Sequence, residues 1–340
     1  MSRKIRTAVV GIGGLAKNVH LPALAEIEKC EIVALCDHRV ERAREQAEVY
    51  SISAVHSSFF SLLESEEFDA AFIITPPESN FLVANECLKA GKHVFVEKPP
   101  ALNLFETETL KRACADHPDL IFQAGYNRRY IPVVRETLDI VRQHTDTITQ
   151  VRGTFFKQTS ASFCGGSGSS FFYDLIHAMD MVRWVAGGDP VQTVLVESQF
   201  GDIVPNCWNG IIRFDNETVG LIESNYNTGG RIHGLEIFGP GVSAIINLGF
   251  GDSSCSSEIL AHEGGNAYSI SAAGNTKTKR ISLDGVKVAG REEFFAYYGF
   301  LQEDMAFFDS VETGKDPINN INEAVKTMAL AERLMQSKLA

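Results

Sequence analysis

The sequence has few features of a membrane, secreted or nucleic-acid-binding protein. No apolar run reaches the roughly 20 residues that a membrane-spanning helix needs, and residues 1–6 lack the apolar core and cleavage site of a secretory signal. Only 31 lysines and arginines stand against 43 aspartates and glutamates, which gives a net charge of -12. This charge disfavours nucleic acid and anionic membranes as the main partners. We therefore expect no nucleic acid and no membrane among the partners, and a small-molecule ligand instead.

The sequence also lacks any cluster of cysteines, because those present are widely scattered. The seven cysteines include no close pair of the kind that metal centres and redox motifs use. An odd and dispersed set is typical of free thiols in a reducing compartment. We therefore expect a cytoplasmic protein with no metal site.

The first part of the chain has the pattern of a parallel α/β fold. A length of 340 residues with 44% hydrophobic content predicts about two domains. In the first, short apolar runs alternate with helical periods, as in βαβ units. The expected strands are residues 6–11, 31–37, 70–75, 93–97 and 120–124. We assign residues 1–125 to a dinucleotide-binding Rossmann domain.

The second part, residues 126–340, has longer strands that alternate polar and apolar residues. Strands expected at 208–214 and 218–225 flank Asp215-Asn216, which is typical of a hairpin turn. Two helical patterns, 294–308 and 321–335, end the chain, and Asn320 with Glu323 resembles a capping box. We predict an α+β domain with a mostly antiparallel open sheet.

A glycine loop follows the first expected strand. Gly11-Ile12-Gly13-Gly14-Leu15-Ala16 fits the pattern G-x-G-x-x-A between an apolar strand and a helical pattern. The first glycine allows the tight turn, the second lets backbone amides approach a pyrophosphate, and the small Ala16 allows close packing. The following helix adds partial positive charge at its N-terminus. The loop therefore predicts a dinucleotide site.

Asp37 ends the second strand, 21 residues after Ala16. An acid at this spacing binds the adenosine ribose hydroxyls and repels a 2'-phosphate, so we expect NAD. Arg39 could reach a 2'-phosphate if Asp37 turned aside, which keeps NADP as an alternative. Otherwise Arg39 is a solvated residue in the first turn of a helix.

Two further motifs end strands of the expected sheet. Thr75-Pro76-Pro77 ends one strand beside the expected nicotinamide, and Glu97-Lys98-Pro99 ends another, which is apolar and β-branched. In open α/β sheets, ligands bind outside the carboxyl ends of the strands. Lys98 is therefore expected to face whatever the glycine loop holds.

Together these segments resemble the Gfo/Idh/MocA oxidoreductases, the family of glucose-fructose oxidoreductase and inositol dehydrogenase. The resemblance covers essentially the whole chain and includes His20–Leu24, Gly125–Tyr130 and Asp174–Asp180 with the following Trp184. Three features are most similar to the MviM-like branch: the segment Asn127-Arg128-Arg129, the pattern Asp174-x-x-His177, and Trp184.

The resemblance implies NAD(P)-linked hydride transfer at a hydroxyl carbon of a sugar, cyclitol or related polyol. It also implies a catalytic pair, Lys98 and His177, and a Lys98–Pro99 peptide that is often cis. The open sheet of the C-terminal α/β domain often mediates oligomers in this family, which implies a homodimer or homotetramer.

The sequence departs from the family pattern at two places. Many members have an aspartate four residues before the histidine, where this chain has Tyr173, and the acid here is Asp174. On a continuous helix, Tyr173 and Asp174 would lie about 40° and 60° from His177, so either could contact it. The segment after Thr75-Pro76-Pro77 usually reaches a histidine and here reaches Asn80.

Alcohol oxidation needs a base within hydrogen-bond reach of the hydroxyl that loses its proton. Lys98 can take that role, and in the reverse direction its ammonium group can polarise the carbonyl. Asn127 and Arg128 follow the last strand of the first domain and are expected to line the site. We expect Arg129 to form a structural ion pair and His20 to be a packing residue near the glycine loop.

The expected site contains two overlapping sets of residues. The cofactor is expected to contact Gly11, Ile12, Gly13, Gly14, Leu15, Ala16, Asp37, Arg39, Thr75, Pro76, Pro77, Asn80, Glu97, Lys98 and Asn127. The substrate is expected to contact Lys98, Asn127, Arg128, Tyr173, Asp174 and His177, of which Lys98, His177, Asp174 and Tyr173 are the candidate catalytic residues.

Three functions fit this pattern. The first is an NAD(P)-dependent oxidoreductase of sugars, cyclitols or related polyols. The second is a catalytically inactive NAD(P)-binding sensor or regulator of the same fold, for which Tyr173 is the main argument. The third is a reductase of a non-sugar carbonyl, which a cleft lined by aromatic residues would support. The presence of Lys98 and His177 favours an enzyme.

Overall fold

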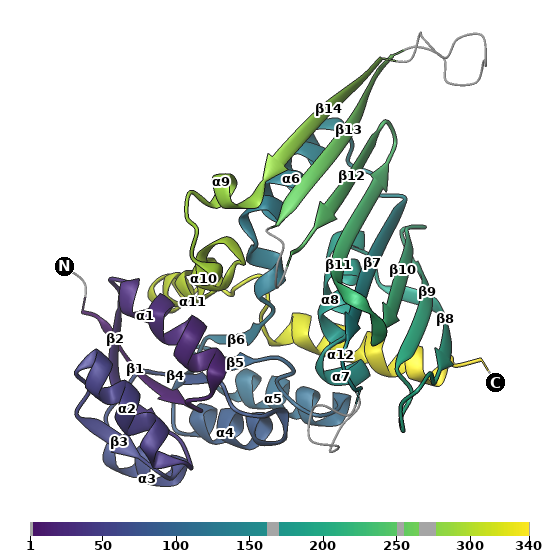
Figure 1. The fold of residues 1–340 in the computed structure, drawn as a ribbon. Helices are drawn as coiled ribbons and strands as arrows, with labels where there is room; N and C mark the ends of the chain where they lie inside the picture. Colours follow the sequence, from purple (N-terminus) through teal and green to yellow (C-terminus); the bar gives the residue numbers. More distant parts are fainter. Residues whose placement is uncertain (1–2, 162–169, 250–254, 265–276, 340) are drawn as a thin grey trace. The chain divides into compact units, whose positions relative to one another are not determined.

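The chain forms two compact units, and each is discontinuous in sequence. A computed structural model describes residues 3–161, 170–249, 255–264 and 277–339 (Figure 1). The first unit contains Met1–Tyr130 and Glu293–Ala329, and the second contains Ile131–Glu292 and Leu330–Ala340. The expected division at residue 125 therefore differs from these units in one long segment, because residues 293–329 pack with the N-terminal part of the chain.

A six-stranded parallel sheet forms the centre of the first unit, as expected for a Rossmann domain. Its strand order is β3-β2-β1-β4-β5-β6, which reverses between β1 and β4 and so creates the switch point at which such sheets bind ligands. The strands are β1 (Ile5–Val10), β2 (Cys30–Cys36), β3 (Ala54–His56), β4 (Ala70–Ile73), β5 (His93–Glu97) and β6 (Phe122–Gly125). The sequence analysis did not predict β3, because its three half-buried residues form no apolar run.

Helices flank this sheet, and β4 and β5 are almost entirely buried. The helices of the first unit are η1 (Ala16–His20), α1 (Leu21–Glu26), α2 (Val40–Tyr50), α3 (Phe59–Ser65), α4 (Pro77–Lys89), α5 (Leu104–Asp116), η2 (Asn127–Tyr130), α10 (Phe294–Tyr297) and α11 (Phe300–Thr313). The pattern expected at 294–308 is split at Gly299, which adopts a φ of 86° that favours glycine. The last helix, α12 (Ile321–Gln336), contributes residues to both units.

Polar bonds attach the segment 293–329 to the end of β6. The fully buried Arg129 donates to the Ile318 carbonyl at 2.6 Å and pairs with Glu323 at 3.1 Å. The Asn319 amide donates to the carbonyl of Ala124 in β6 at 2.5 Å. The expected ion pair of Arg129 is thus confirmed. The side chain of Glu323 therefore pairs with Arg129. Asn320 caps α12, because its side-chain oxygen accepts from the backbone amide of Glu323.

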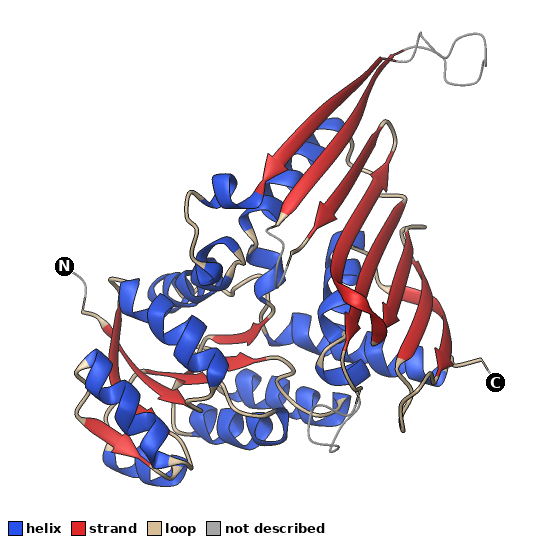
Figure 2. Ribbon diagram, viewed as in Figure 1, coloured by secondary structure: helices blue, strands red, loops and turns tan. Residues whose placement is uncertain are grey.

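The second unit is built on an eight-stranded sheet (Figure 2). Its order is β14-β13-β12-β11-β7-β10-β9-β8, and only the pairing of β7 with β10 is parallel, so the expected mostly antiparallel sheet is confirmed. The strands are β7 (Gln150–Gln158), β8 (Pro190–Ser198), β9 (Cys207–Phe214), β10 (Val219–Asn225), β11 (Asn227–Gly239), β12 (Val242–Asn247), β13 (Ser256–Gly264) and β14 (Lys277–Asp284). The hairpin predicted around Asp215-Asn216 joins β9 to β10.

Helices cover one face of this sheet. Helix α8 (Ile176–Ala186) packs on β7 and β10, and α6 (Pro132–His144) packs on β12, β13 and β14. Two short helices, α7 (Ser170–Tyr173) and α9 (Gly285–Ala289), complete the unit. The strands alternate in burial, so apolar side chains also point away from the helices. The large aliphatic side chains exposed on these strands are Val191, Val194, Val196, Ile211, Ile232 and Ile245.

The state of the cysteines and the length of the helices can be compared with the expectations from the sequence. Six cysteines are described and all six are free, whereas Cys164 lies outside the described residues. Within the described part of the chain, no helix has the length and apolar content needed to span a bilayer.

We predict that Arg129→Met destabilises the protein by about 3 to 5 kcal/mol, because the change removes one partner of a buried ion pair and leaves polar groups unpaired. Urea unfolding of the full chain measures the loss. The matched control is Arg142→Met, which removes an exposed pair with Asp139 (3.8 Å) and should cost at most about 1 kcal/mol. Equal losses in the two variants would contradict the role of Arg129.

Candidate functional site

The glycine loop lies at the switch point between β1 and β4. Gly11 has a φ of 93°, and a Cβ atom there would lie 2.4 Å from the Ile74 carbonyl oxygen, so only glycine fits. A Cβ on Gly13 or Gly14 would meet nothing within 4 Å. The loop is therefore packed against the sheet on one side and open on the other, where a pyrophosphate can approach the backbone.

The helix after the loop is a π-helix, η1, that continues directly into α1. The π form is rare and is often found at functional sites. A cavity of about 230 Å³ lies beside it, lined by Ile12, Gly13, Gly14, Lys17, Arg42, Glu45 and Gln46. The exposed loop backbone and the two basic side chains give this cavity the chemistry of a phosphate-binding surface.

Asp37 is held next to the glycine loop. Its carboxylate accepts from the backbone amide of Ile12 at 2.7 Å and from that of Arg39 at 2.8 Å. The side chain is therefore fixed by two bonds at the end of β2, while Arg39 is exposed. This geometry fits a carboxylate that binds ribose hydroxyls, and it does not fit one that has turned aside.

Asn80 fixes the backbone on both sides of Lys98. Its amide nitrogen donates to the carbonyls of Glu97 at 2.9 Å and Pro99 at 2.8 Å, and its oxygen accepts from the Thr75 hydroxyl at 2.7 Å. The Lys98–Pro99 peptide is cis, as the family resemblance implied. Since both amide hydrogens of Asn80 are used by the protein, its direct contact with a cofactor stays a prediction. Lys98 itself is half-buried at the end of β5.

His20 is fully buried between two acids, one of which is Glu97, the residue before Lys98. Its Nδ1 faces both carboxylate oxygens of Asp304 at 3.1 Å, and its Nε2 faces Glu97 Oε1 at 3.1 Å. Burial lowers the pKa of His20, but Asp304 and Glu97 outweigh this effect and raise the pKa to about 10. Burial also raises the pKa of the Asp304 carboxyl. The ring is thus a buried imidazolium between two acids.

The sequence analysis expected only a packing role for His20 and did not find Asp304. Asp304 is separated from His20 by 284 positions, and no local pattern connects them. Gly125 pairs with Glu97 in the sheet. A Cβ there would lie 3.0 Å from Glu97 Cδ, so the glycine leaves room for the Glu97 side chain.

Asn127 and Arg128 lie in η2, and both are buried. The Asn127 amide donates to the Tyr298 carbonyl at 2.9 Å. This bond stays within the first unit, and the expected contacts of both residues with cofactor or substrate stay predictions.

In the second unit, the continuous helix expected from Tyr173 to Val185 is interrupted. Tyr173 is the last residue of α7, Asp174 and Leu175 form a turn, and His177 is the second residue of α8. The angular positions calculated for one helix therefore do not apply. The His177 backbone amide donates to the Asp174 carbonyl at 3.3 Å, which keeps the two residues adjacent.

Asp174 belongs to a buried polar cluster. Its Oδ2 accepts from the Tyr226 hydroxyl at 2.9 Å and from the Lys157 ammonium group. Lys157 comes from β7 and also lies over the Tyr226 ring, 4.9 Å from its centroid. The sequence analysis missed Lys157 and Tyr226, because each is one polar residue in an alternating strand region. Asp180 pairs with Arg183 at 3.9 Å on the same helix.

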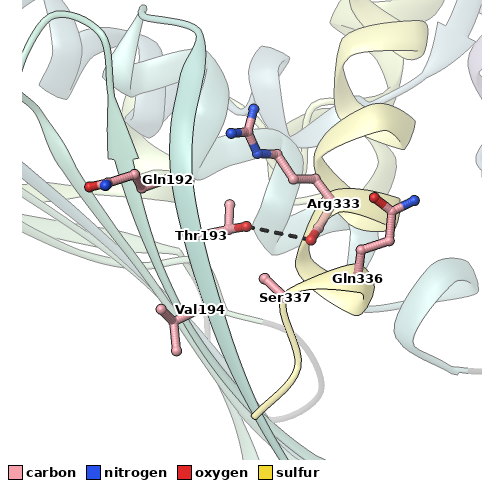
Figure 3. Close-up of a pocket in the computed structure, with 6 residues that line it drawn as sticks. All are labelled: Gln192, Thr193, Val194, Arg333, Gln336 and Ser337. Atoms are coloured by element: carbon pink, nitrogen blue, oxygen red, sulfur yellow. Dashed lines mark hydrogen bonds between the residues drawn. The ribbon is translucent and has the colours of Figure 1, made fainter.

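A larger cavity, of about 540 Å³, lies elsewhere in the second unit (Figure 3). Residues 192–194 of β8 and three residues near the end of α12 line it, and Thr193 donates to the Arg333 carbonyl at 3.4 Å. Its Gln, Ser and Thr side chains include no acid or base suited to proton transfer, and none of the predicted site residues lines it. Among the described residues, no group of three or more His, Cys, Asp or Glu could hold a metal ion.

Comparison with known proteins identifies the family. Residues 5–126 match the oxidoreductase family with an NAD-binding Rossmann fold, and residues 163–338 match the C-terminal α/β domain of the same family. The chain belongs to the Gfo/Idh/MocA oxidoreductase family. It is therefore an NAD(P)-binding oxidoreductase, as the glycine loop and Asp37 predicted.

Two similar proteins are named as dehydrogenases of an inositol and of a glucoside. Myo-inositol 2-dehydrogenase of Thermotoga maritima is 25% identical over 250 residues, which cover 69% of this chain and 73% of the relative. D-glucoside 3-dehydrogenase of Escherichia coli is 25% identical over 256 residues, covering 66% and 71%. A dehydrogenase structure from Chromobacterium violaceum has a TM-score of 0.84 at 18% identity, covering 99% and 96%, and supports the same fold.

The buried imidazolium makes stability depend on pH. The pKa of His20 rises from about 6.5 in the unfolded chain to about 10 in the folded protein. Protonated His20 therefore stabilises the fold, and this contribution is complete below about pH 6.5. This contribution falls as pH rises towards the pKa of the folded protein, by at most about 1.4 kcal/mol per unit. Among nearby groups, burial raises the pKa of the Asp304 carboxyl and raises the pKa of the Cys30 thiol to about 12, above this range.

Urea unfolding of the wild type between about pH 7 and pH 9.5 should show this fall. Asp304→Asn, which keeps the shape but removes one charge, should be less stable at pH 7 and show a flatter dependence. Asp309→Asn, an exposed acid on the same helix paired with Lys29, is the control and should parallel the wild type. Parallel curves for all three proteins would rule out a charged His20.

Proposed function

We propose that this protein transfers a hydride between a nicotinamide dinucleotide and a hydroxyl or carbonyl carbon of a sugar, cyclitol or related polyol, with Lys98 and His177 as acid/base groups. The main observation is the position of Lys98. It follows β5 at the carboxyl edge of the parallel sheet, the edge that also carries the glycine loop, and Asn80 and Glu97 hold its backbone. The two characterised relatives support the substrate class, since both are named dehydrogenases of polyhydroxylated rings.

Lys98 supplies the proton chemistry in this proposal. A bound oxidised nicotinamide would accept the hydride from the alcohol carbon. Neutral Lys98 removes the hydroxyl proton in that direction, and the ammonium form returns it to the carbonyl oxygen in reverse. A half-buried lysine suits both steps, because it is partly shielded from water and still reachable.

His177 and its neighbours would form the second part of the machinery. Asp174 is anchored by Lys157 and Tyr226 and adjoins His177 through the backbone. We infer that Asp174 orients the imidazole indirectly, as a carboxylate held in the turn before α8. Tyr173, at the end of α7, is the alternative partner in the relay, since its hydroxyl can donate or accept.

The cofactor preference that we infer is NAD. The Asp37 carboxylate is fixed by two backbone amides and presents negative charge where a 2'-phosphate would lie. The exposed Arg39 and the cavity residues Lys17 and Arg42 supply positive charge nearby, which keeps NADP as the alternative.

We also infer a homodimer or homotetramer formed through the eight-stranded sheet. Six aliphatic side chains of β8, β9, β11 and β12 are exposed on that sheet, an arrangement that commonly marks an interface. Light scattering of the purified protein decides the point, and a monomer would refute it.

A sensor or regulator of the same fold is the competing function, because Tyr173 occupies the position of the usual aspartate. The two are distinguished by turnover. A screen of cyclitols, sugars and sugar acids with NAD and NADP should detect dinucleotide reduction with at least one compound. Tight dinucleotide binding without any turnover would favour the sensor.

We predict that Lys98→Ala lowers kcat by about 100-fold or more, the usual effect of losing one acid/base group. NAD affinity, measured by titration, should change little, because the glycine loop and Asp37 are untouched. Lys89→Ala is the control, an exposed lysine of α4 that pairs with Glu86. Turnover that survives in Lys98→Ala would exclude this lysine as the base.

We predict that wild type binds NAD more tightly than NADP and that Asp37→Ala reduces or reverses this preference. The alanine removes the charge that repels a 2'-phosphate and also the bond to the Ile12 amide. Titration of both proteins with both dinucleotides measures the change. Tighter binding of NADP by the wild type would overturn the preference for NAD.

A further inference from the structure

We propose that His20 is a positioning residue for catalysis, which holds Lys98 in its working orientation through the side chain of Glu97. This inference rests on the proposed function, because it presumes that Lys98 is the acid/base group. It assigns to Glu97, His20 and Asp304 a role separate from cofactor binding.

A continuous series of hydrogen bonds connects helix α11 to the peptide of Lys98. Asp304 binds His20 Nδ1 at 3.1 Å, and His20 Nε2 binds Glu97 Oε1 at 3.1 Å. The other oxygen of Glu97, Oε2, accepts from the Lys98 backbone amide at 3.0 Å. Each carboxylate oxygen of Glu97 therefore has a separate partner, one that anchors it and one that it positions.

Histidine is the residue that this geometry requires. Both ring nitrogens face carboxylates in different directions, so both must carry a hydrogen, and only the imidazolium form of histidine has two such donors. An uncharged residue here would leave the buried Asp304 carboxylate and one oxygen of Glu97 without the donor that each has now. Such an arrangement is costly unless the charges are paired and hydrogen-bonded.

The surroundings fix the imidazole ring in one orientation. Phe72, Phe95 and Phe300 each contact it edge-on, with centroid distances of 6.2, 5.4 and 5.5 Å. His20 is also the last residue of the π-helix η1 and the N-cap of α1. The space for the Glu97 side chain comes from Gly125, which pairs with Glu97 across β5 and β6.

The hydrogen bonds of Asn80 hold the same stretch of backbone as this series does. Asn80 binds the carbonyls of Glu97 and Pro99, and Glu97 binds the amide of Lys98. The backbone is thus fixed before, at and after the lysine, which sets the direction in which its flexible stem leaves the chain. Misplacement of a reacting group by about 1 Å can cost about 100-fold in rate, so such anchoring has a catalytic effect.

The test uses the full chain with NAD and myo-inositol, or the polyol with highest turnover if myo-inositol is not converted. Asp304→Asn and Glu97→Gln keep the shape of each side chain and weaken one bond of the series. We expect kcat to fall about 10- to 100-fold, with KM and the Kd of NAD within about twofold of wild type. Asp309→Asn, an exposed change on the same helix, should behave as wild type.

The double variant separates positioning from general destabilisation. If Asp304 acts on Lys98 through Glu97, the combined variant loses less than the product of the two single losses. A product of independent losses would overturn the proposal. So would a wild-type kcat in both folded single variants, or a loss of NAD binding that parallels the loss of kcat.

A second readout needs no substrate. An amine-reactive ester labels lysines, and peptide mass spectrometry compares the labelling rate of Lys98 with that of Lys89. We expect faster relative labelling of Lys98 in Asp304→Asn and Glu97→Gln, because its backbone is less firmly held, and no change in Asp309→Asn. Unchanged labelling in both variants would overturn the proposal even if no polyol is turned over.

Failure of the inference is distinguishable from failure of the proposed function. Full turnover in Lys98→Ala refutes the acid/base role that the proposed function gives to Lys98, and dinucleotide binding without any turnover in the wild type refutes the function itself. Loss of turnover in Lys98→Ala together with normal kcat in Asp304→Asn and Glu97→Gln refutes only the role of His20.

Discussion

A positive charge buried between two acids organises the N-terminal unit. Moving an ion out of water costs several kcal/mol, and pairing repays this only with good geometry and complete hydrogen bonding. The geometry of His20 meets both conditions, since each ring nitrogen has a carboxylate at 3.1 Å. The pairing joins the helix after the glycine loop, the end of β5 and helix α11, which are far apart in sequence. The dinucleotide loop and the lysine motif are therefore parts of one rigid arrangement.

The second unit uses the same principle with other residues. Asp174 is buried and accepts from the ammonium group of Lys157 and the hydroxyl of Tyr226. A cation and a neutral donor from two strands thus fix an acid in the turn before α8. In both units, the residues that the family resemblance connects with chemistry lie on short irregular segments, and buried ion pairs supply the rigidity that those segments lack.

Local sequence patterns predicted the parts of the site that depend on local geometry. The glycine loop, Asp37 and the lysine motif lie at strand ends, and apolar periodicity locates strand ends well. Contacts between distant residues leave no such pattern, and for this reason Asp304, Lys157 and Tyr226 were not predicted. The interruption between α7 and α8 was missed because the sequence pattern continues with the spacing of one helix across the turn. Sequence patterns did not show that residues 293–329 pack with the N-terminal unit, since amphipathic periodicity shows that a helix is buried but not which sheet it packs on.

The return of residues 293–329 to the N-terminal unit affects how the protein can fold during synthesis. Domains generally fold as units, with the N-terminal one first, as the chain leaves the ribosome. Here the first unit lacks Asp304, Phe307 and the partner of Arg129 until nearly the whole chain has been made. His20 therefore lacks Asp304, and Arg129 lacks Glu323, while the entire second sheet is translated. The unit that begins the chain is completed last. Because each unit consists of two separate stretches of sequence, a single crossover between two genes cannot exchange one whole unit.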